Sequence, residues 1–274
     1  GAITDATYTG CEPYISPKWK THPDITIADV GNFDMSDQFV ITTPATPDGT
    51  VSVYQLNSAF YTGNGDVSLL TTIDQYTAVT KFGRQVKICA FHAAIATGSD
   101  VFDASSQVYI FDRNLQGENQ WSTIATKIYS VPKLMGISTA KNVVVACSRY
   151  TNKFYIFSRS AADWGDIASV TYTGEAGKQL GESCGCTSNY AITGCFQTQK
   201  AYIFSRDATG WSSAPQVISG SGGAFGHGVS ISDTFAFVGS YSSSTAVYIY
   251  QRSSGKTWNT TPVVTIQKDI LHFG

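Results

Sequence analysis

The four histidines come first, because imidazole binds metals and transfers protons near neutral pH. They are His22, His92, His227 and His272, and no two of them pair at the spacing of a metal-binding motif. The chain has neither a G-x-S-x-G nucleophile motif nor an H-E-x-x-H metal motif. His227 and His272 each stand beside a Phe-Gly pair. One interpretation places a metal between these two histidines, and the other exposes both in turns.

Six cysteines could carry redox or metal chemistry. Cys184 and Cys186 are two residues apart, so on a strand they face the same side. We expect both to be buried core thiols, with a disulfide from one of them to a neighbouring strand as the alternative. The better disulfide candidates stand near the ends of expected strands and are Cys11, Cys147 and Cys195. Their pairing stays open, because six cysteines allow many connectivities.

Spaced carboxylates are the ligands that calcium prefers. Asp100 and Asp103 lie in the turn-rich segment 97–107 and are the weak calcium candidates of this chain. An ordinary polar loop is the alternative. We therefore predict no cofactor, with calcium as the one ion to test.

A repeated phrase shows which elements must position these residues. Its tyrosine recurs as Tyr109, Tyr155, Tyr202 and Tyr248, at spacings of 46, 47 and 46 residues, and all five tryptophans follow a copy of the phrase. Each repeat contains four short runs rich in β-branched and aromatic residues, separated by turn residues, which indicates strands. The second run is almost wholly apolar, as in a strand buried on both faces. Four strands in a repeat of about 45 residues predict a β-propeller blade.

We therefore predict an all-β protein with a single β-propeller domain over residues 1–274. Five repeats lie near residues 29–79, 80–130, 131–176, 177–223 and 224–269. Residues 1–28 resemble the second to fourth strands of a blade, and residues 270–274 resemble the first. Six blades are expected, the sixth being a composite of both termini that removes the open edge of the ring. The alternative is a segment of a longer array.

The order of these features resembles the FG-GAP repeat, which builds the propellers of integrin α-subunits and related surface proteins. A Phe-Gly pair opens the repeat, then come an alternating strand, an apolar strand, the Tyr-Ile-Phe-x-Arg phrase and a Trp. The opening pair is kept at Phe82-Gly83, Phe225-Gly226 and Phe273-Gly274, becomes Leu180-Gly181, and is lost at Val131-Pro132. The resemblance covers nearly the whole chain and implies binding through propeller loops. Many members carry a loop of three spaced Asp residues for calcium, and this sequence departs from that pattern.

The loops after the second strands differ between repeats and are expected on one rim of the ring. Aromatic side chains mixed with polar ones suit a protein or sugar ligand, and packing of loop on loop is the alternative. The candidate ligand-binding residues in these loops are Arg149, Tyr150, Phe196, Gln197 and Tyr241.

Composition narrows the partners. The net charge is −2 and no Lys/Arg cluster occurs, which argues against nucleic acid. No apolar run is long enough to span a membrane. Asn259 opens the sequon Asn-Thr-Thr and is a glycosylation candidate. Together with the resemblance, these features favour a secreted or cell-surface location.

Our first functional hypothesis is a non-catalytic extracellular or cell-surface module for adhesion or assembly, which binds a protein partner or copies of itself. A carbohydrate-binding lectin is the alternative, because the ring would repeat a small glycan site. A hydrolase or lyase with a site in the axial funnel is the third. We expect no enzyme, because no acid–base pair recurs among the repeats.

Overall fold

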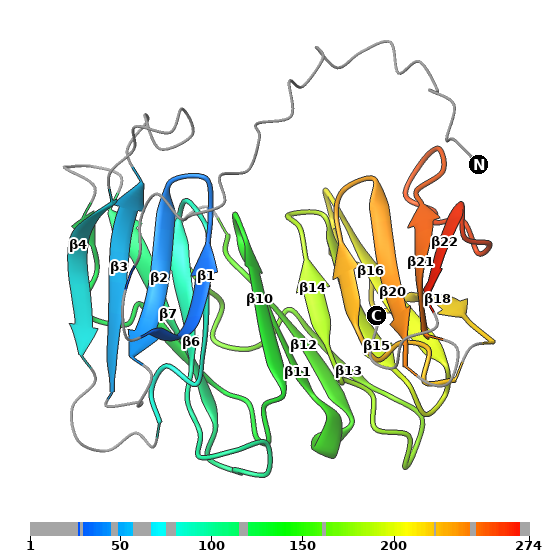
Figure 1. The fold of residues 1–274 in the computed structure, drawn as a ribbon, viewed down its shortest axis with the longest axis horizontal. Helices are drawn as coiled ribbons and strands as arrows, with labels where there is room; N and C mark the ends of the chain where they lie inside the picture. The colour runs from blue at the N-terminus through cyan, green and yellow to red at the C-terminus, as the bar shows by residue number, and fades with distance from the viewer. Residues whose placement is uncertain are drawn as a thin grey trace.

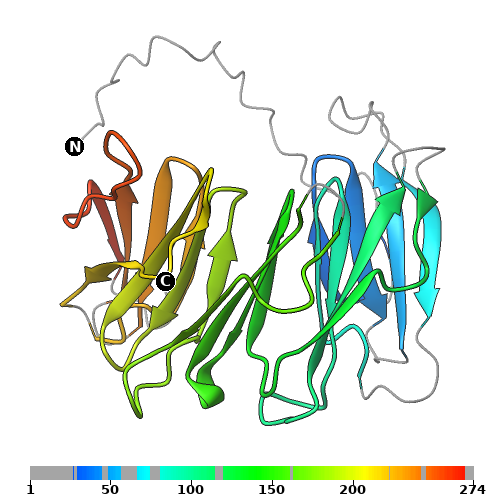
Figure 2. The same ribbon diagram turned by 180° about the vertical axis from the view of Figure 1, so that it is seen from behind.

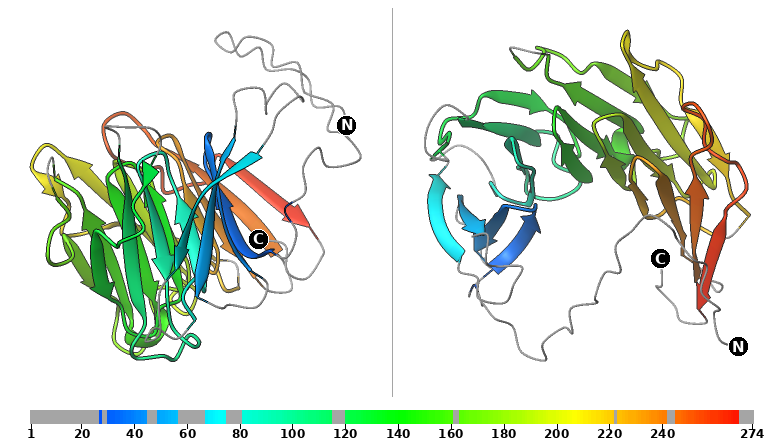
Figure 3. Two further views of the ribbon diagram at one scale, coloured as in Figure 1. Left: turned by 90° about the vertical axis from the view of Figure 1, so that its left-hand side faces the viewer. Right: turned by 90° about the horizontal axis from the view of Figure 1, so that it is seen from above.

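The computed structural model describes residue 27 and residues 30–44, 49–56, 67–74, 81–114, 120–160, 163–221, 223–241 and 245–268. Within them the chain forms five antiparallel sheets (Figure 1). The view from behind shows the same succession of sheets (Figure 2), and the view from above shows it following an arc (Figure 3). Residues 1–26 and 269–274 lie outside the described residues, so the composite sixth blade stays a prediction.

Each sheet contains four main strands. The first has β1 (Val30–Met35), β2 (Phe39–Pro44), β3 (Thr50–Leu56) and β4 (Val67–Asp74). The second has β5 (Gln85–Ile88), β6 (His92–Ala96), β7 (Gln107–Asn114) and β9 (Lys127–Ser130), with β8 (Gln120–Trp121) at the end of β7. The third has β10 (Gly136–Ala140), β11 (Val143–Ser148), β12 (Lys153–Ser158) and β13 (Val170–Thr173), with the 3-10 turn η2 (Arg149–Thr151) between β11 and β12.

The fourth sheet has β14 (Cys184–Cys186), β15 (Tyr190–Cys195), β16 (Lys200–Asp207) and β18 (Gln216–Ser219), with β17 (Gly210–Trp211) at the end of β16. The fifth has β19 (Val229–Ile231), β20 (Phe235–Ser240), β21 (Thr245–Gln251) and β22 (Val264–Lys268). In every sheet each main strand pairs with the main strand that follows it in sequence, so β9 pairs with β7 and β18 with β16. The first strand of each sheet contacts the first strand of the next, as expected for blades around an axis. The prediction of an all-β propeller with four-stranded blades is confirmed.

The second strand of each blade forms the centre of the core. β6, β11 and β15 are buried along their whole length, in keeping with sequences that are mostly apolar or small on both faces. Four clusters of buried hydrophobic residues lie between successive sheets. Because each cluster takes residues from two blades, no single blade can bury its faces alone.

The repeated tryptophans hold neighbouring blades together. Trp121 packs edge to face on Phe39 of the preceding blade, with ring centroids 5.2 Å apart. Trp258 packs in the same way on Tyr190, also at 5.2 Å. Such pairs contribute about 0.5–1.5 kcal/mol beyond the burial of their area. Packing between blades thereby explains why Trp recurs among the residues that the structure describes.

Candidate functional site

The predicted rim residues come together at one end of the strands. Arg149 and Tyr150 lie in η2, at the lower end of the view in Figure 1, while Phe196 follows β15. The Arg149 guanidinium carbon lies 4.5 Å from the centroid of the Tyr150 ring and 5.9 Å from that of Phe196. Arg149 Nη1 also donates a 2.6 Å hydrogen bond to Glu182 Oε2, which joins the third blade to the fourth.

His227 continues this contact into the fifth blade. Its Nε2 lies 3.7 Å from Glu182 Oε1. Its ring stacks on Tyr241 with centroids 5.0 Å apart and planes at 28°, and lies 6.0 Å from the Phe196 ring. We call the set Arg149, Tyr150, Glu182, Phe196, His227 and Tyr241 the rim cluster. Gln197 is exposed beside it in sequence, and no contact to the cluster places it there.

The second blade extends the rim cluster through Phe102. This side chain is 59% exposed and packs on Tyr150, with ring centroids 4.5 Å apart. Aromatic side chains from four successive blades therefore line one rim. Tyr241, at 39% exposed, ends the run.

Two glycines explain how Glu182 and His227 reach the rim. Gly181 and Gly226 have φ values of +98° and +89°, a backbone conformation that is unfavourable for residues with a Cβ atom. A Cβ on Gly181 would lie 2.9 Å from Ser148 N, and one on Gly226 would lie 2.5 Å from Lys200 O, both in the preceding blade. Each glycine allows the chain to pack closely against the preceding blade. The residue that follows it, Glu182 or His227, is thereby placed beside a loop of that blade. The sequence analysis missed Glu182 and considered His227 only as a metal ligand or an exposed turn residue.

An ion pair between Arg149 and Glu182 lies at the centre of the rim cluster. The Arg149 and Glu182 side chains are 22% and 10% exposed, so their ion pair is only partly hydrated. Burial lowers the pKa of Arg149, and hydrogen bonds to Glu182 and to the Tyr150 hydroxyl raise it further than burial lowers it. Arg149 Nε is buried and has no hydrogen-bond partner among the described residues. The pair is therefore a fixed polar feature on an aromatic surface.

The calcium candidates have another use in the structure. Asp103 Oδ1 accepts hydrogen bonds from Ser105 N and Oγ, and its Oδ2 accepts one from Ser99 N at 2.7 Å. These bonds lower the pKa of Asp103 to about 2. Asp100 Oδ1 accepts from Phe102 N at 2.7 Å. Both carboxylates thus stabilise the turn that presents Phe102, and the described residues contain no group of three potential metal ligands. Calcium binding at Asp100 and Asp103 stays the untested alternative to an ordinary polar loop.

Cys147 and Cys195 are buried free thiols, so no disulfide joins them to each other. Cys195 Sγ donates to Lys178 O at 2.8 Å, and Cys147 Sγ donates to Gly136 O at 3.5 Å. Cys11 and the histidines His22 and His272 lie outside the described residues, as does the metal site considered between His227 and His272. Asn259 is half-buried beside Trp258, and its glycosylation stays a prediction.

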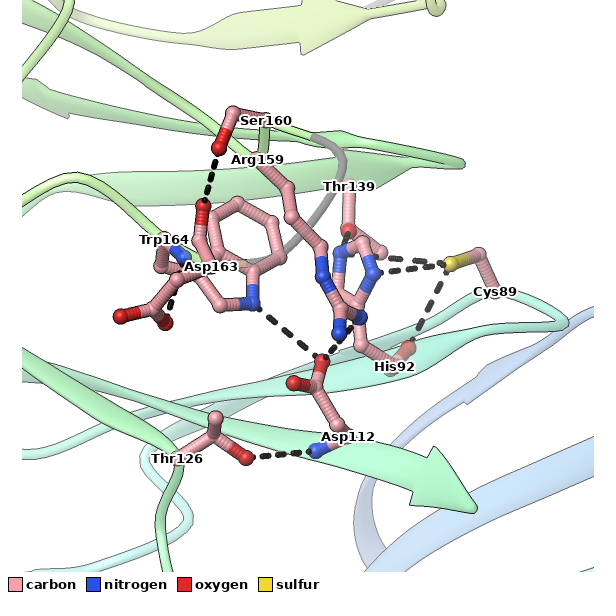
Figure 4. A network of polar contacts seen from close by, with 9 residues as sticks. All are labelled: Cys89, His92, Asp112, Thr126, Thr139, Arg159, Ser160, Asp163 and Trp164. Carbon is pink, nitrogen blue, oxygen red and sulfur yellow. Dashed lines mark hydrogen bonds and ion pairs between the residues drawn. The ribbon is translucent and has the colours of Figure 1, made fainter. Parts of the chain in front are cut away.

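A buried polar network around His92 pairs a thiol with an imidazole (Figure 4). Cys89 Sγ lies 3.5 Å from His92 Nδ1, and His92 Nε2 contacts the Thr139 hydroxyl. Burial, with a smaller contribution from Arg159, lowers the pKa of His92 to about 3, while burial raises the pKa of Cys89. Both shifts favour the neutral pair, so Cys89 is a poor nucleophile.

His92 instead fills the aromatic position between blades. It packs edge to face on Trp164 with centroids 4.9 Å apart, as Phe39 packs on Trp121. Trp164 Nε1 donates to Asp112 Oδ1 at 3.2 Å, and Arg159 pairs with the same carboxylate at 3.1 Å. We interpret the network as structural.

No protein-family model matches the chain, and no curated protein matches it. Solved structures do resemble it. A putative 6-phosphogluconolactonase from Bacteroides fragilis has a TM-score of 0.58 at 11% identity, over 88% of this chain and 72% of that one. Sqt1 from Chaetomium thermophilum, bound to the N-terminus of ribosomal protein L10, has a TM-score of 0.52 at 10% identity, over 80% of this chain and 58% of that one.

The WD40 domain of Toxoplasma gondii coronin gives a TM-score of 0.51 at 14% identity, over 88% of this chain and 60% of that one. The chain thus spans less than two thirds of the length of the Sqt1 and coronin structures. At these identities the likeness shows the fold alone. None of the helices among the described residues has the length and apolar character needed to cross a membrane.

One prediction needs correction. We expected no enzyme because no acid–base pair recurs among the repeats, and that conclusion is wrong. Two of the similar structures are putative 6-phosphogluconolactonases, at 11% and 13% identity, so enzymes share this fold. The inference failed because a catalytic site needs only one set of residues in a ring, not a recurring one. By fold, the chain is a β-propeller.

Proposed function

We propose that this chain is a protein-interaction module that binds a segment of a partner protein across the rim cluster and Phe102. The observation that carries the proposal is the run of partly exposed aromatic side chains from four blades, centred on the Arg149–Glu182 ion pair. Aromatic residues and Arg dominate the energetics of protein interfaces. A surface whose side chains already hold one another loses little conformational entropy on binding.

A propeller engaging a short peptide segment has a parallel among the similar structures. Sqt1 was solved bound to the N-terminus of a ribosomal protein. We therefore propose an extended peptide segment with at least one apolar side chain as the ligand class. We further propose an FG-GAP-like protein acting outside the cell, which is supported by the repeat pattern, the low charge and the sequon at Asn259.

The test is a screen of the purified protein against a random peptide display library and, in parallel, a glycan array. Phe196→Ala and Tyr241→Ala each remove one rim aromatic side chain. Ile167→Ala is the matched control, because Ile167 is an apolar side chain, 80% exposed, in the segment between β12 and β13 at the opposite end of the strands. We expect selected peptides whose binding weakens at least about tenfold in the rim variants and is unchanged in the control.

Other outcomes contradict the proposal. Glycans selected in place of peptides, with loss in the rim variants, would identify a lectin. Peptide binding that both rim variants retain would place the interface elsewhere. Self-association lost in the rim variants would make a second copy of the chain the partner.

A further inference from the structure

Two thiols from different blades face each other at the boundary between the third and fourth sheets. Cys147 lies on β11 and is fully buried, while Cys184 lies on β14, is half-buried, and packs on the same hydrophobic cluster. The two thiols interact with each other. Both are free in the structure.

Gly136 provides the space in which the two sulfur atoms meet. It pairs with Cys147 across β10 and β11. A Cβ on Gly136 would lie 3.2 Å from Cys147 Sγ and 3.8 Å from Cys184 Sγ. Both sulfur atoms therefore border the volume that any larger side chain would occupy.

The boundary between the fourth and fifth blades has an equivalent contact, made there by a glycine and a valine. Cys147 follows the residue paired with Tyr155, and Gly194 follows the residue paired with the equivalent Tyr202. A Cβ on Gly194 would lie 3.2 Å from Val229 Cγ1 on β19. The second and first strands of successive blades thus touch at this place, and at one boundary both positions hold cysteine.

We propose that Cys147 and Cys184 form a disulfide that covalently joins the third and fourth blades when the protein meets a small-molecule disulfide such as oxidised glutathione. The more accessible Cys184 loses its proton and attacks one glutathione sulfur, which releases one glutathione thiol. Cys147 then attacks the Cys184 sulfur and releases the second. The protein loses two protons and two electrons, and the glutathione disulfide takes up both.

The surroundings set the rate of this exchange. The contact with the Cys147 thiol, together with burial, raises the pKa of Cys184 well above its usual value. Because only the thiolate attacks, the reaction is slow at neutral pH and faster in alkaline solution. An oxidising compartment would give the bond time to form.

The experiment uses the full chain, reduced and folded, which is incubated with oxidised glutathione at about pH 6.5 and about pH 8.5. The first pH lies well below the ordinary pKa of a thiol and the second lies close to it. Remaining thiols are alkylated, and the chain is digested without reduction by trypsin and then chymotrypsin for mass spectrometry. Tyr190 lets chymotrypsin separate Cys195 from Cys184. Cys186 stays in the Cys184 fragment, so the Cys186→Ser variant assigns the partner.

We expect a linked Cys147–Cys184 fragment that forms faster at pH 8.5, persists in Cys186→Ser and Cys195→Ser, and is absent from Cys184→Ser. Gly136→Ala should slow its formation without unfolding the chain, which circular dichroism checks. The proposal is overturned if both residues remain alkylatable, if Cys184 stops at the mixed disulfide with glutathione, or if Cys147 links to another cysteine.

Discussion

Arg149 and Glu182 form a 2.6 Å ion pair across the boundary of the third and fourth blades, and their side chains are 22% and 10% exposed. Glu182 also lies 3.7 Å from His227 of the fifth blade. One carboxylate therefore contacts basic side chains from both neighbouring blades. Removing it leaves the Arg149 charge partly buried and without its partner.

Glu182→Ala should consequently destabilise the protein by about 1–3 kcal/mol, measured by urea denaturation. Glu175 offers a matched control, because it pairs with Lys200 at 2.5 Å but is 51% exposed. Exposed pairs contribute about 0–1 kcal/mol, so Glu175→Ala should have little effect. Equal effects of the two substitutions would show that the buried position of Glu182 does not matter.

The conformation of Gly226 gives a second prediction. Gly226→Ala would combine a φ of +89° with a Cβ 2.5 Å from Lys200 O, and should destabilise the fold by about 2–4 kcal/mol. Gly255 has a similar φ of +84° but nothing within 4 Å of its built Cβ. Gly255→Ala should therefore cost only about 1 kcal/mol. Thermal or urea unfolding of both variants distinguishes the effect of crowding from that of backbone strain. Equal losses of stability in the two variants would mean that the structure relieves the crowding at Gly226.

The sequence predicted the fold but only part of the rim cluster. The period and the apolar second strands predicted the fold, because every blade must satisfy the same packing. Arg149, Phe196 and Tyr241 could be named as candidates because they stand in loops that differ between repeats. Glu182 was missed because its place depends on Gly181 packing against the preceding blade, which no single repeat reveals.

The third repeat was misaligned for a related reason. The sequence analysis gave the opening Phe-Gly pair of this repeat as lost at Val131-Pro132. In the structure Lys133, with a φ of +56°, precedes buried Leu134, just as Lys81, with a φ of +51°, precedes buried Phe82. Leu134 thus takes the phenylalanine position three residues later. No glycine directly follows Leu134, so the sequence has no Phe-Gly-like pair to mark this position.

His92 leads to a prediction about pH. Its folded pKa of about 3 lies below the ordinary value of 6.5, so the unfolded chain binds the proton more readily. The stability contributed by neutral His92 is complete above pH 6.5 and is lost as the pH falls toward 3, by of order 2–4 kcal/mol. His92→Phe keeps the contact with Trp164 and should flatten the stability profile over this range. Urea denaturation of both proteins from pH 3.5 to pH 7.5 tests it, and parallel profiles would contradict the assignment.

The predicted composite sixth blade can be tested through the first sheet. Val86 and Ile88 of β5 are buried in the cluster shared with the first sheet. Phe33 and Met35 of β1, which the repeat aligns with them, are 66% and 52% exposed. A sheet preceding β1 would cover this face, as the first sheet covers β5. We therefore expect deletion of residues 1–26 to lower the melting temperature by more than about 5 °C.

Deletion alone could act for other reasons, so a double-mutant cycle is needed. Phe33→Ser should destabilise the full chain by about 2 kcal/mol or more, because it places a hydroxyl in a buried apolar contact, and should have almost no effect in the deleted chain. Ile124→Ser is the control, since Ile124 is 78% exposed and should tolerate the change in both backgrounds. Additive effects of Phe33→Ser and the deletion would mean that the N-terminal segment does not cover β1, and the ring would then have to be completed from outside residues 1–26.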